Sequence, residues 1–132
     1  MKLGTLRSVA IVLLVGLVAC RTVNKHVSKG FDAYTKLDYT LAEKEFLEAM
    51  KDDDNDPYAQ LNLGALYQAT GRPQMAVPLY IKVLESGKNI RPNRKTANSR
   101  TNVSSPTLAE IAQANLDALA AAGKATAAII KK

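Results

Sequence analysis

Residues 56–86, DPYAQLNLGALYQATGRPQMAVPLYIKVLES, decide the fold of this chain. Asp56 is a typical N-cap, because a short side-chain oxygen accepts hydrogen bonds from the first turn of a helix. Pro57 suits the first helical position, where no backbone N–H is required. Gly71 is suited to end the helix. These signals predict a helix over 57–70.

A second helix follows directly. Pro73 is suited to begin it, and its apolar residues recur at helical spacing, which predicts a helix over 73–86. Pro78 falls within the first two turns, where a proline is either accommodated or kinks the helix. Upstream, the same periodicity predicts helices over 23–36 and 39–53.

The small and aromatic residues of this region recur with a period of 34. The matched pairs are Gly30 and Gly64, Ala42 and Ala76, Phe46 and Tyr80, and Ala49 and Val83. This period resembles the tetratricopeptide repeat, a pair of antiparallel helices. The second unit matches that family at Leu63, Gly64, Tyr67, Gly71, Ala76, Tyr80 and Val83. The first unit departs from it at His26, where the family often has Trp, and at Ala33, where it often has Tyr.

The resemblance implies an all-α fold. Two tetratricopeptide units over 23–86 form a short right-handed α-solenoid, and a C-terminal helix caps it. The small residues lie where the two helices of a unit cross, and Phe46 and Tyr80 fill the space toward the next unit. The residues expected to extend the apolar core stripe are Leu41, Leu47, Met50, Leu66, Leu79 and Leu84.

The resemblance also implies a peptide-binding groove lined by the first helix of each unit. The groove candidates are Asn24, Val27, Ser28, Phe31 and Tyr34 in unit one, and Tyr58, Leu61, Asn62, Ala65 and Gln68 in unit two. Some members clamp a peptide carboxylate with Lys and Asn, but Val27 and Phe31 occupy two of those places. A groove for a hydrophobic or extended peptide fits better. The alternative is that the aromatic candidates are simply buried between helices.

The first twenty residues have the pattern of an export signal. Lys2 and Arg7 precede an uncharged run over 9–20, which as a helix spans roughly 18 Å against the ~30 Å of a bilayer core. That length is typical of a signal peptide rather than a membrane span. Residues 17–20, LVAC, resemble the lipobox of bacterial lipoproteins, which implies cleavage of residues 1–19 and lipidation of Cys20. The alternative is an incidental cysteine in an uncleaved signal anchor.

The residue after the cysteine bears on location. Lipoproteins with Asp at that place are often retained in the inner membrane, but this chain has Arg21. The resemblance therefore favours residues 20–22 as the lipidated start of a protein anchored in the bacterial cell envelope. We expect the outer membrane, with the domain facing the periplasm.

The C-terminal third has a different composition. Residues 87–105 are polar and basic and predict a linker. Ser105 as N-cap and Pro106 as first residue are expected to begin a capping helix within 106–132. Its apolar stripe comprises Leu108, Ile111, Ala112, Leu116 and Leu119. Gly123 is expected to end it before a second short helix, and a degenerate third repeat or an amphipathic partner helix are the alternatives.

Charge is also uneven along the chain. Residues 23–86 hold seven Lys/Arg and ten Asp/Glu, a formal charge of −3, whereas residues 87–132 hold eight Lys/Arg and two Asp/Glu, a formal charge of +6. A basic segment is attracted to anionic lipid or an acidic partner, but a solvated linker is the explanation that the sequence favours. For an exported domain we expect no nucleic-acid partner.

No motif for catalysis or metal binding is evident. Asp52, Asp54 and Asp56 resemble the start of a calcium loop, but the required Gly and Glu places are Pro57 and Leu63. The single histidine and single cysteine form no ligand cluster, and no Gly-rich phosphate loop occurs. We therefore expect no enzyme activity, no cofactor and no metal.

Two functions remain. The first is a membrane-tethered interaction module that binds a protein or peptide partner as a scaffold or adaptor in an envelope, pilus or secretion assembly. The second is a structural subunit that forms homo-oligomers through the ends of its solenoid.

Overall fold

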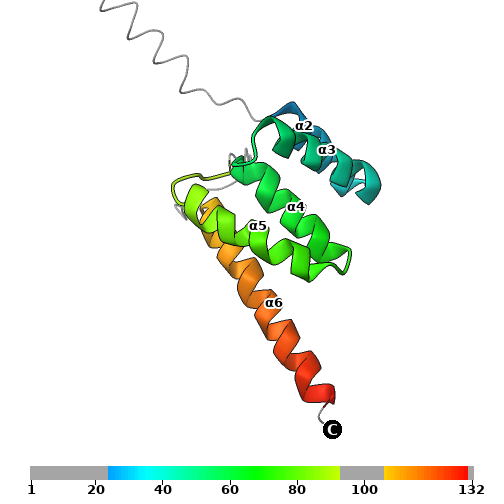
Figure 1. The fold of residues 1–132 in the computed structure, drawn as a ribbon, viewed down its shortest axis with the longest axis vertical. Helices are drawn as coiled ribbons and strands as arrows, with labels where there is room; N and C mark the ends of the chain where they lie inside the picture. The colour runs from blue at the N-terminus through cyan, green and yellow to red at the C-terminus, as the bar shows by residue number, and fades with distance from the viewer. Residues whose placement is uncertain (1–23, 93–105, 131–132) are drawn as a thin grey trace, which may run out of the picture.

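The computed structural model describes residues 24–92 and 106–130, with side chains up to Lys124. Within those ranges the chain is entirely helical, as predicted, and contains no strand. The helices are α2 (Lys25–Thr35), α3 (Tyr39–Asp52), α4 (Pro57–Ala69), α5 (Pro73–Ser86) and α6 (Leu108–Ile130) (Figure 1). The predicted signal peptide, Cys20 and most of the predicted linker lie outside the described residues.

The predicted helix signals act at the ends of α4 and α5. The Asp56 carboxylate accepts hydrogen bonds from the backbone N–H groups of Tyr58 at 2.9 Å and Ala59 at 3.3 Å, so it is the N-cap. Gly71 has a φ of +74°, which glycine adopts without strain. The α5 helix continues through Pro78 without a break.

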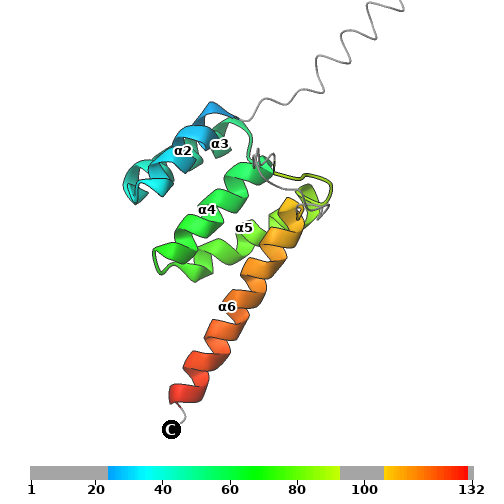
Figure 2. The ribbon, with the colours of Figure 1, turned by 180° about the vertical axis from the view of Figure 1, so that it is seen from behind.

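The helices form two layers. Consecutive helices pack against each other, and α4 also contacts α2 and α6, whereas α3 and α5 do not contact each other. Therefore α2, α4 and α6 make one layer, and α3 and α5 make a second layer whose members diverge. Figure 1 views the molecule from the α3 and α5 side, and Figure 2 views it from the α2 and α6 side.

Both helix pairs cross in the same way. A Cβ atom added to Gly30 would lie 2.5 Å from the Phe46 ring, and one added to Gly64 would lie 2.7 Å from the Tyr80 ring. Phe46 and Tyr80 are 1% and 0% exposed. The crossings therefore need a residue without a side chain opposite a buried aromatic ring, and the spacing of 34 places this arrangement in each pair.

The outer surface of α2 is polar. Its exposed residues occupy places that are buried in α4, 34 residues later. The pairs are Lys25 and Ala59, Lys29 and Leu63, and Asp32 and Leu66. Because charged side chains oppose burial, this face of α2 is not suited to pack against another helix as the same face of α4 does.

The start of α6 differs from the prediction. The helix begins at Leu108, so Ser105 and Pro106 are not its N-cap and first residue. Thr107 and Glu110 form a capping box instead: the Thr107 N–H donates to Glu110 Oε2 at 2.6 Å, and the Glu110 N–H donates to Thr107 Oγ1 at 3.2 Å. Two reciprocal bonds satisfy more backbone donors than the single bond of a serine cap.

The end of α6 also differs. The helix runs through Gly123 to Ile130 rather than ending there, because the alanine-rich flanks favour helix strongly enough to carry one glycine. Its first turns pack on α5 and α4 through buried Leu108 and Ala112, and its later turns extend beyond the body (Figures 1 and 2). No helix among the described residues has the length and hydropathy needed to span a bilayer.

Leu37 supplies a testable feature of the turn between α2 and α3. It is 71% exposed and has a φ of 62°, a conformation that costs a side-chain-bearing residue energy. Gly71 occupies the equivalent place in the second pair. We expect Leu37→Gly to raise the free energy of unfolding by about 0.5–1 kcal/mol in urea denaturation. Lys36→Gly, at a φ of −89°, should give no gain; equal stabilisation by both changes would contradict this explanation.

Candidate functional site

The predicted groove residues lie on the layer of α2 and α4, but not all of them are accessible. Val27 is 3% exposed and packs with Ala49 and Ala59, and Leu61 is 9% exposed within the main core. These two side chains serve the core and offer almost no surface to a partner. Sequence position alone did not distinguish these two core residues from the accessible groove candidates, because core-facing and groove-facing places lie close together on one helix.

Asn24 also has a structural role. Its Oδ1 accepts a hydrogen bond from the His26 N–H at 2.8 Å, and its Nδ2 donates to Asp52 at 3.3 Å. Asn24 is therefore the N-cap of α2 and links α2 to the end of α3. Its side-chain hydrogen-bonding groups are already occupied on both sides.

The remaining candidates form an accessible surface, which we call the α2–α4 face. Phe31 is 52% exposed, and Ser28 is also exposed. The partly exposed members are Tyr34, Tyr58, Asn62, Ala65 and Gln68. The α4 helix has no charged residue from end to end. The α2–α4 face is therefore aromatic and amide in character, and neutral.

Two amides on this face keep unused hydrogen-bonding capacity. The Asn62 Nδ2 donates to the Tyr58 carbonyl at 2.8 Å, which leaves its Oδ1 as an acceptor. The Gln68 Oε1 accepts from the Tyr80 hydroxyl at 2.9 Å, which leaves its Nε2 as a donor. The Asn62 Oδ1 can accept from a peptide N–H group, and the Gln68 Nε2 can donate to a peptide C=O group.

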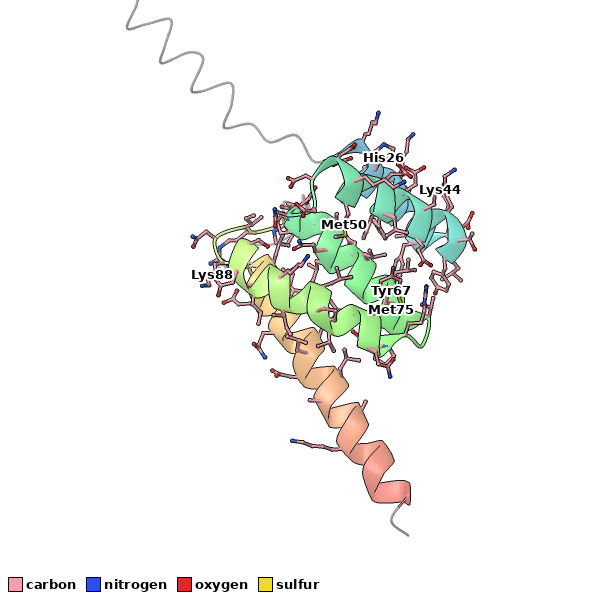
Figure 3. The ribbon with its side chains drawn as sticks, viewed as in Figure 1. His26, Lys44, Met50, Tyr67, Met75 and Lys88 are labelled. Carbon is pink, nitrogen blue, oxygen red and sulfur yellow. The ribbon has the colours of Figure 1, made fainter. Side chains whose placement is uncertain are left out.

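A cavity of about 740 Å³ lies along α3, beside the turn between α4 and α5, and we call it the α3 groove. Its lining residues are Tyr39, Thr40, Glu43, Lys44, Leu47, Glu48, Met50, Lys51, Thr70 and Arg72. None of the predicted groove residues lines it. Figure 3 shows Lys44 on the outer side of α3 and Met50 on the side toward α4.

The sequence interpretation missed this groove because it assigned Leu41 and Leu47 to the core stripe. Both are exposed, at 43% and 41%, whereas Leu66 is fully buried as expected. The sequence does contain a signal that Leu47 is exposed, namely its angular position around the helix axis. On a helix, Leu47 points well away from the face shared by Ala42, Phe46 and Ala49.

An ion-pair network holds one side of the α3 groove. Arg72 donates to both carboxylate oxygens of Glu43, at 2.9 and 2.8 Å, and its Nε donates to Thr70 Oγ1 at 3.0 Å. The guanidinium lies 4.5 Å from the centre of the Tyr67 ring. This network ties α3 to the turn between α4 and α5, so it joins the two helix pairs.

The same network predicts a dependence of stability on pH. The hydrogen bonds from Arg72 lower the pKa of Glu43 below 4.5, and the nearby positive charge adds to this effect. Because the folded state has the lower pKa, the carboxylate stabilises the fold above about pH 4.5, and this contribution is lost as the pH falls through the folded pKa. We expect Glu43→Gln to reduce stability near neutral pH and to weaken its decline in acid.

Urea denaturation across this pH range measures the effect. Glu85→Gln is the matched control, since exposed Glu85 pairs with exposed Lys88 in the turn that follows α5, and water screens that pair strongly. If the free energy of unfolding of Glu43→Gln fell in acid as steeply as that of the wild type, the ion pair of Glu43 with Arg72 would have no stabilising role.

The single histidine is also paired. The Nδ1 of His26 lies 2.6 Å from Glu45 Oε2, and this hydrogen bond lowers the pKa of Glu45. The contact joins α2 to α3. Among the residues that the structure describes, no group of three His, Cys, Asp or Glu side chains is placed to hold a metal ion.

Two surfaces thus stand out on opposite layers. The α2–α4 face is neutral, aromatic and partly unsatisfied in hydrogen bonding, and the α3 groove is apolar with lysines and glutamates along it. No family model, curated protein or solved structure matches this chain, so its own residues carry the functional argument.

Proposed function

We propose that this protein is a membrane-tethered interaction module that resembles a tetratricopeptide protein and binds a peptide segment on its α2–α4 face. The repeated helix crossing carries the proposal: Gly30 meets Phe46 as Gly64 meets Tyr80, 34 residues apart. Two pairs built alike have their first helices, α2 and α4, in contact, which supports a single surface shared by both helices.

The chemistry of the α2–α4 face supports an extended, uncharged segment as its ligand. Phe31, Tyr34 and Tyr58 offer apolar area for aliphatic or aromatic side chains. The free Asn62 acceptor and Gln68 donor suit a main chain whose N–H and C=O groups are not used in a helix. A charged peptide would be desolvated here without a partner, so it is disfavoured.

Selection of displayed decapeptides on the full-length protein in detergent micelles tests this proposal. We expect the selected sequences to be aliphatic or aromatic and uncharged, and Phe31→Ala and Asn62→Ala each to weaken their binding about tenfold. Leu47→Ala on the opposite layer is the matched control and should leave affinity unchanged. Selection of no peptide above background, or equal losses at Leu47 and Phe31, would contradict the proposal.

The membrane tether is supported by the signal-like segment that ends at Cys20. Two or more acyl chains would anchor the domain stably, since each buried CH₂ contributes about 0.8 kcal/mol. Mass spectrometry of the membrane-extracted protein should find an acylated Cys20 as its first residue, and Cys20→Ala should remain uncleaved or unlipidated. An unmodified Met1 in the mature protein would contradict the tether.

A role as a structural subunit joined through the ends of the stack is less well supported. The α2 end presents exposed Lys25, Lys29 and Asp32 where a further unit would need apolar residues. We therefore place the scaffold or adaptor role in an envelope, pilus or secretion assembly first. Catalysis remains unexpected on the sequence grounds given above.

A further inference from the structure

The α3 groove needs an explanation that peptide binding on the α2–α4 face does not supply. Most of its lining comes from α3, and Leu47 lies near the middle with 41% of its surface exposed. The other lining residues, Thr70 and Arg72, belong to the turn that leads into α5, so the groove runs along α3. An exposed apolar side chain in such a groove is suited to receive a second helix laid along α3.

Positive charges flank this apolar centre at a defined spacing. Lys44 and Lys51 are seven residues apart, which is about two helical turns or roughly 10.5 Å. Lys51 pairs with Glu48 on its own helix at 2.6 Å, but the lysine side chain is 70% exposed, so water screens that pair strongly. A helix that enters the groove therefore meets Lys44 on one side of Leu47 and Lys51, with its paired Glu48, on the other, while Glu43 is neutralised by Arg72.

The exposed face of α6 carries the complementary pattern. Glu110 and Asp117 are also seven residues apart and both are exposed; one oxygen of Glu110 accepts from the Thr107 N–H, and one oxygen of Asp117 accepts from Gln113 at 2.9 Å. Between them lies exposed Ala114, and Ala118 follows. Small side chains allow two helix axes to approach to about 8 Å. The charge spacing, the apolar centre and the close approach all match the α3 groove.

We propose that the α3 groove binds α6 of a second copy of this chain. In an antiparallel arrangement Lys44 faces Asp117 of the second copy, Lys51 faces its Glu110, and Leu47 faces its Ala114. Antiparallel packing also opposes the helix dipoles favourably. Because the groove and the α6 face are different surfaces, each copy gives its α6 to one neighbour and receives α6 from another.

Cysteine cross-linking in membranes tests the contact directly. Two full-length copies with tags of different size are co-expressed, one carrying Leu47→Cys and the other Ala114→Cys. Oxidation should give a disulfide-linked product that contains both tags. The wild-type pair, which has only Cys20, is the control for links through that residue, and Lys36→Cys in place of Leu47→Cys is the control for random collision.

Charge reversal supplies an independent test in the same assay. Lys44→Glu with Lys51→Glu in the Leu47→Cys copy should lower the yield of the linked product at least tenfold, and Asp117→Lys in the other copy should restore part of it. The matched control is Lys29→Glu with Lys36→Glu, which makes the same charge change on exposed residues seven apart on the α2 side. Circular dichroism confirms that each variant is helical, and Lys44→Glu alone replaces any variant that is not.

Several outcomes would overturn the proposal. One is a linked product of equal yield with Lys36→Cys, and another is a yield that the reversal at Lys44 and Lys51 leaves unchanged. A link only between two Ala114→Cys copies would mean that α6 pairs with α6. Absence of any link would leave the groove to a different protein. None of these results depends on peptide binding at the α2–α4 face, so the two proposals fail separately.

Discussion

Replacing Tyr80 with alanine is expected to lower the free energy of unfolding by about 3–5 kcal/mol. Tyr80 is completely buried and its ring lies against Gly64. Its hydroxyl donates to Gln68 at 2.9 Å, and its ring belongs to one buried cluster with Leu66 and Leu108, so this one side chain joins α4, α5 and α6. A small domain has a free energy of unfolding of only about 5–15 kcal/mol in total, so this one change removes a large fraction of it.

Urea denaturation followed by circular dichroism measures this loss. Tyr80→Phe is the matched variant, because it keeps the ring and removes only the hydroxyl, and it should cost about 1 kcal/mol. Burial raises the pKa of Tyr80 to about 12, so the hydroxyl remains a donor throughout the accessible pH range. A loss of less than 1 kcal/mol for Tyr80→Ala would mean that the ring does not fill the space between the helices.

Changing Gly64 or Gly30 to alanine is expected to destabilise the fold by about 1–3 kcal/mol, despite the better helix propensity of alanine. The new Cβ would lie 2.7 Å from the Tyr80 ring or 2.5 Å from the Phe46 ring. Both rings are buried, so neither can move aside without disturbing its neighbours. Thermal unfolding of the two variants should show similar losses.

Gly123→Ala is the control for helix propensity. Gly123 lies inside α6 with nothing within 4 Å of an added Cβ, so alanine should stabilise this helix by up to about 1 kcal/mol. Opposite signs at Gly64 and Gly123 would show that close approach, rather than propensity, fixes glycine at the crossings. Stabilisation at all three positions would contradict the packing described above.

Local signals predicted the helices of the two pairs well. Asp56, Pro57, Gly71 and Pro73 act on the backbone within a few residues, so their effect is readable from sequence. The predicted start of α6 was wrong because two capping signals lie within three residues of each other. The structure uses the reciprocal pair of Thr107 and Glu110.

The candidate site was predicted less completely, because accessibility depends on how whole helices are layered. Phe31 and Asn62 lie on the accessible face as expected, but Val27 and Leu61 are buried and Asn24 caps a helix. The α3 groove was missed altogether. It forms where α3 meets the turn between α4 and α5, and no local pattern in α3 encodes how that turn is placed against it.

The equivalence of the two helix crossings is the claim on which the proposed function depends, and proton NMR tests it most directly. We predict nuclear Overhauser contacts between the Gly30 Hα protons and the Phe46 ring, and equally strong contacts between the Gly64 Hα protons and the Tyr80 ring. Both glycines should also show upfield ring-current shifts. Contacts in only one pair, or in neither, would contradict a stack of two like helix pairs and remove the basis for the α2–α4 face.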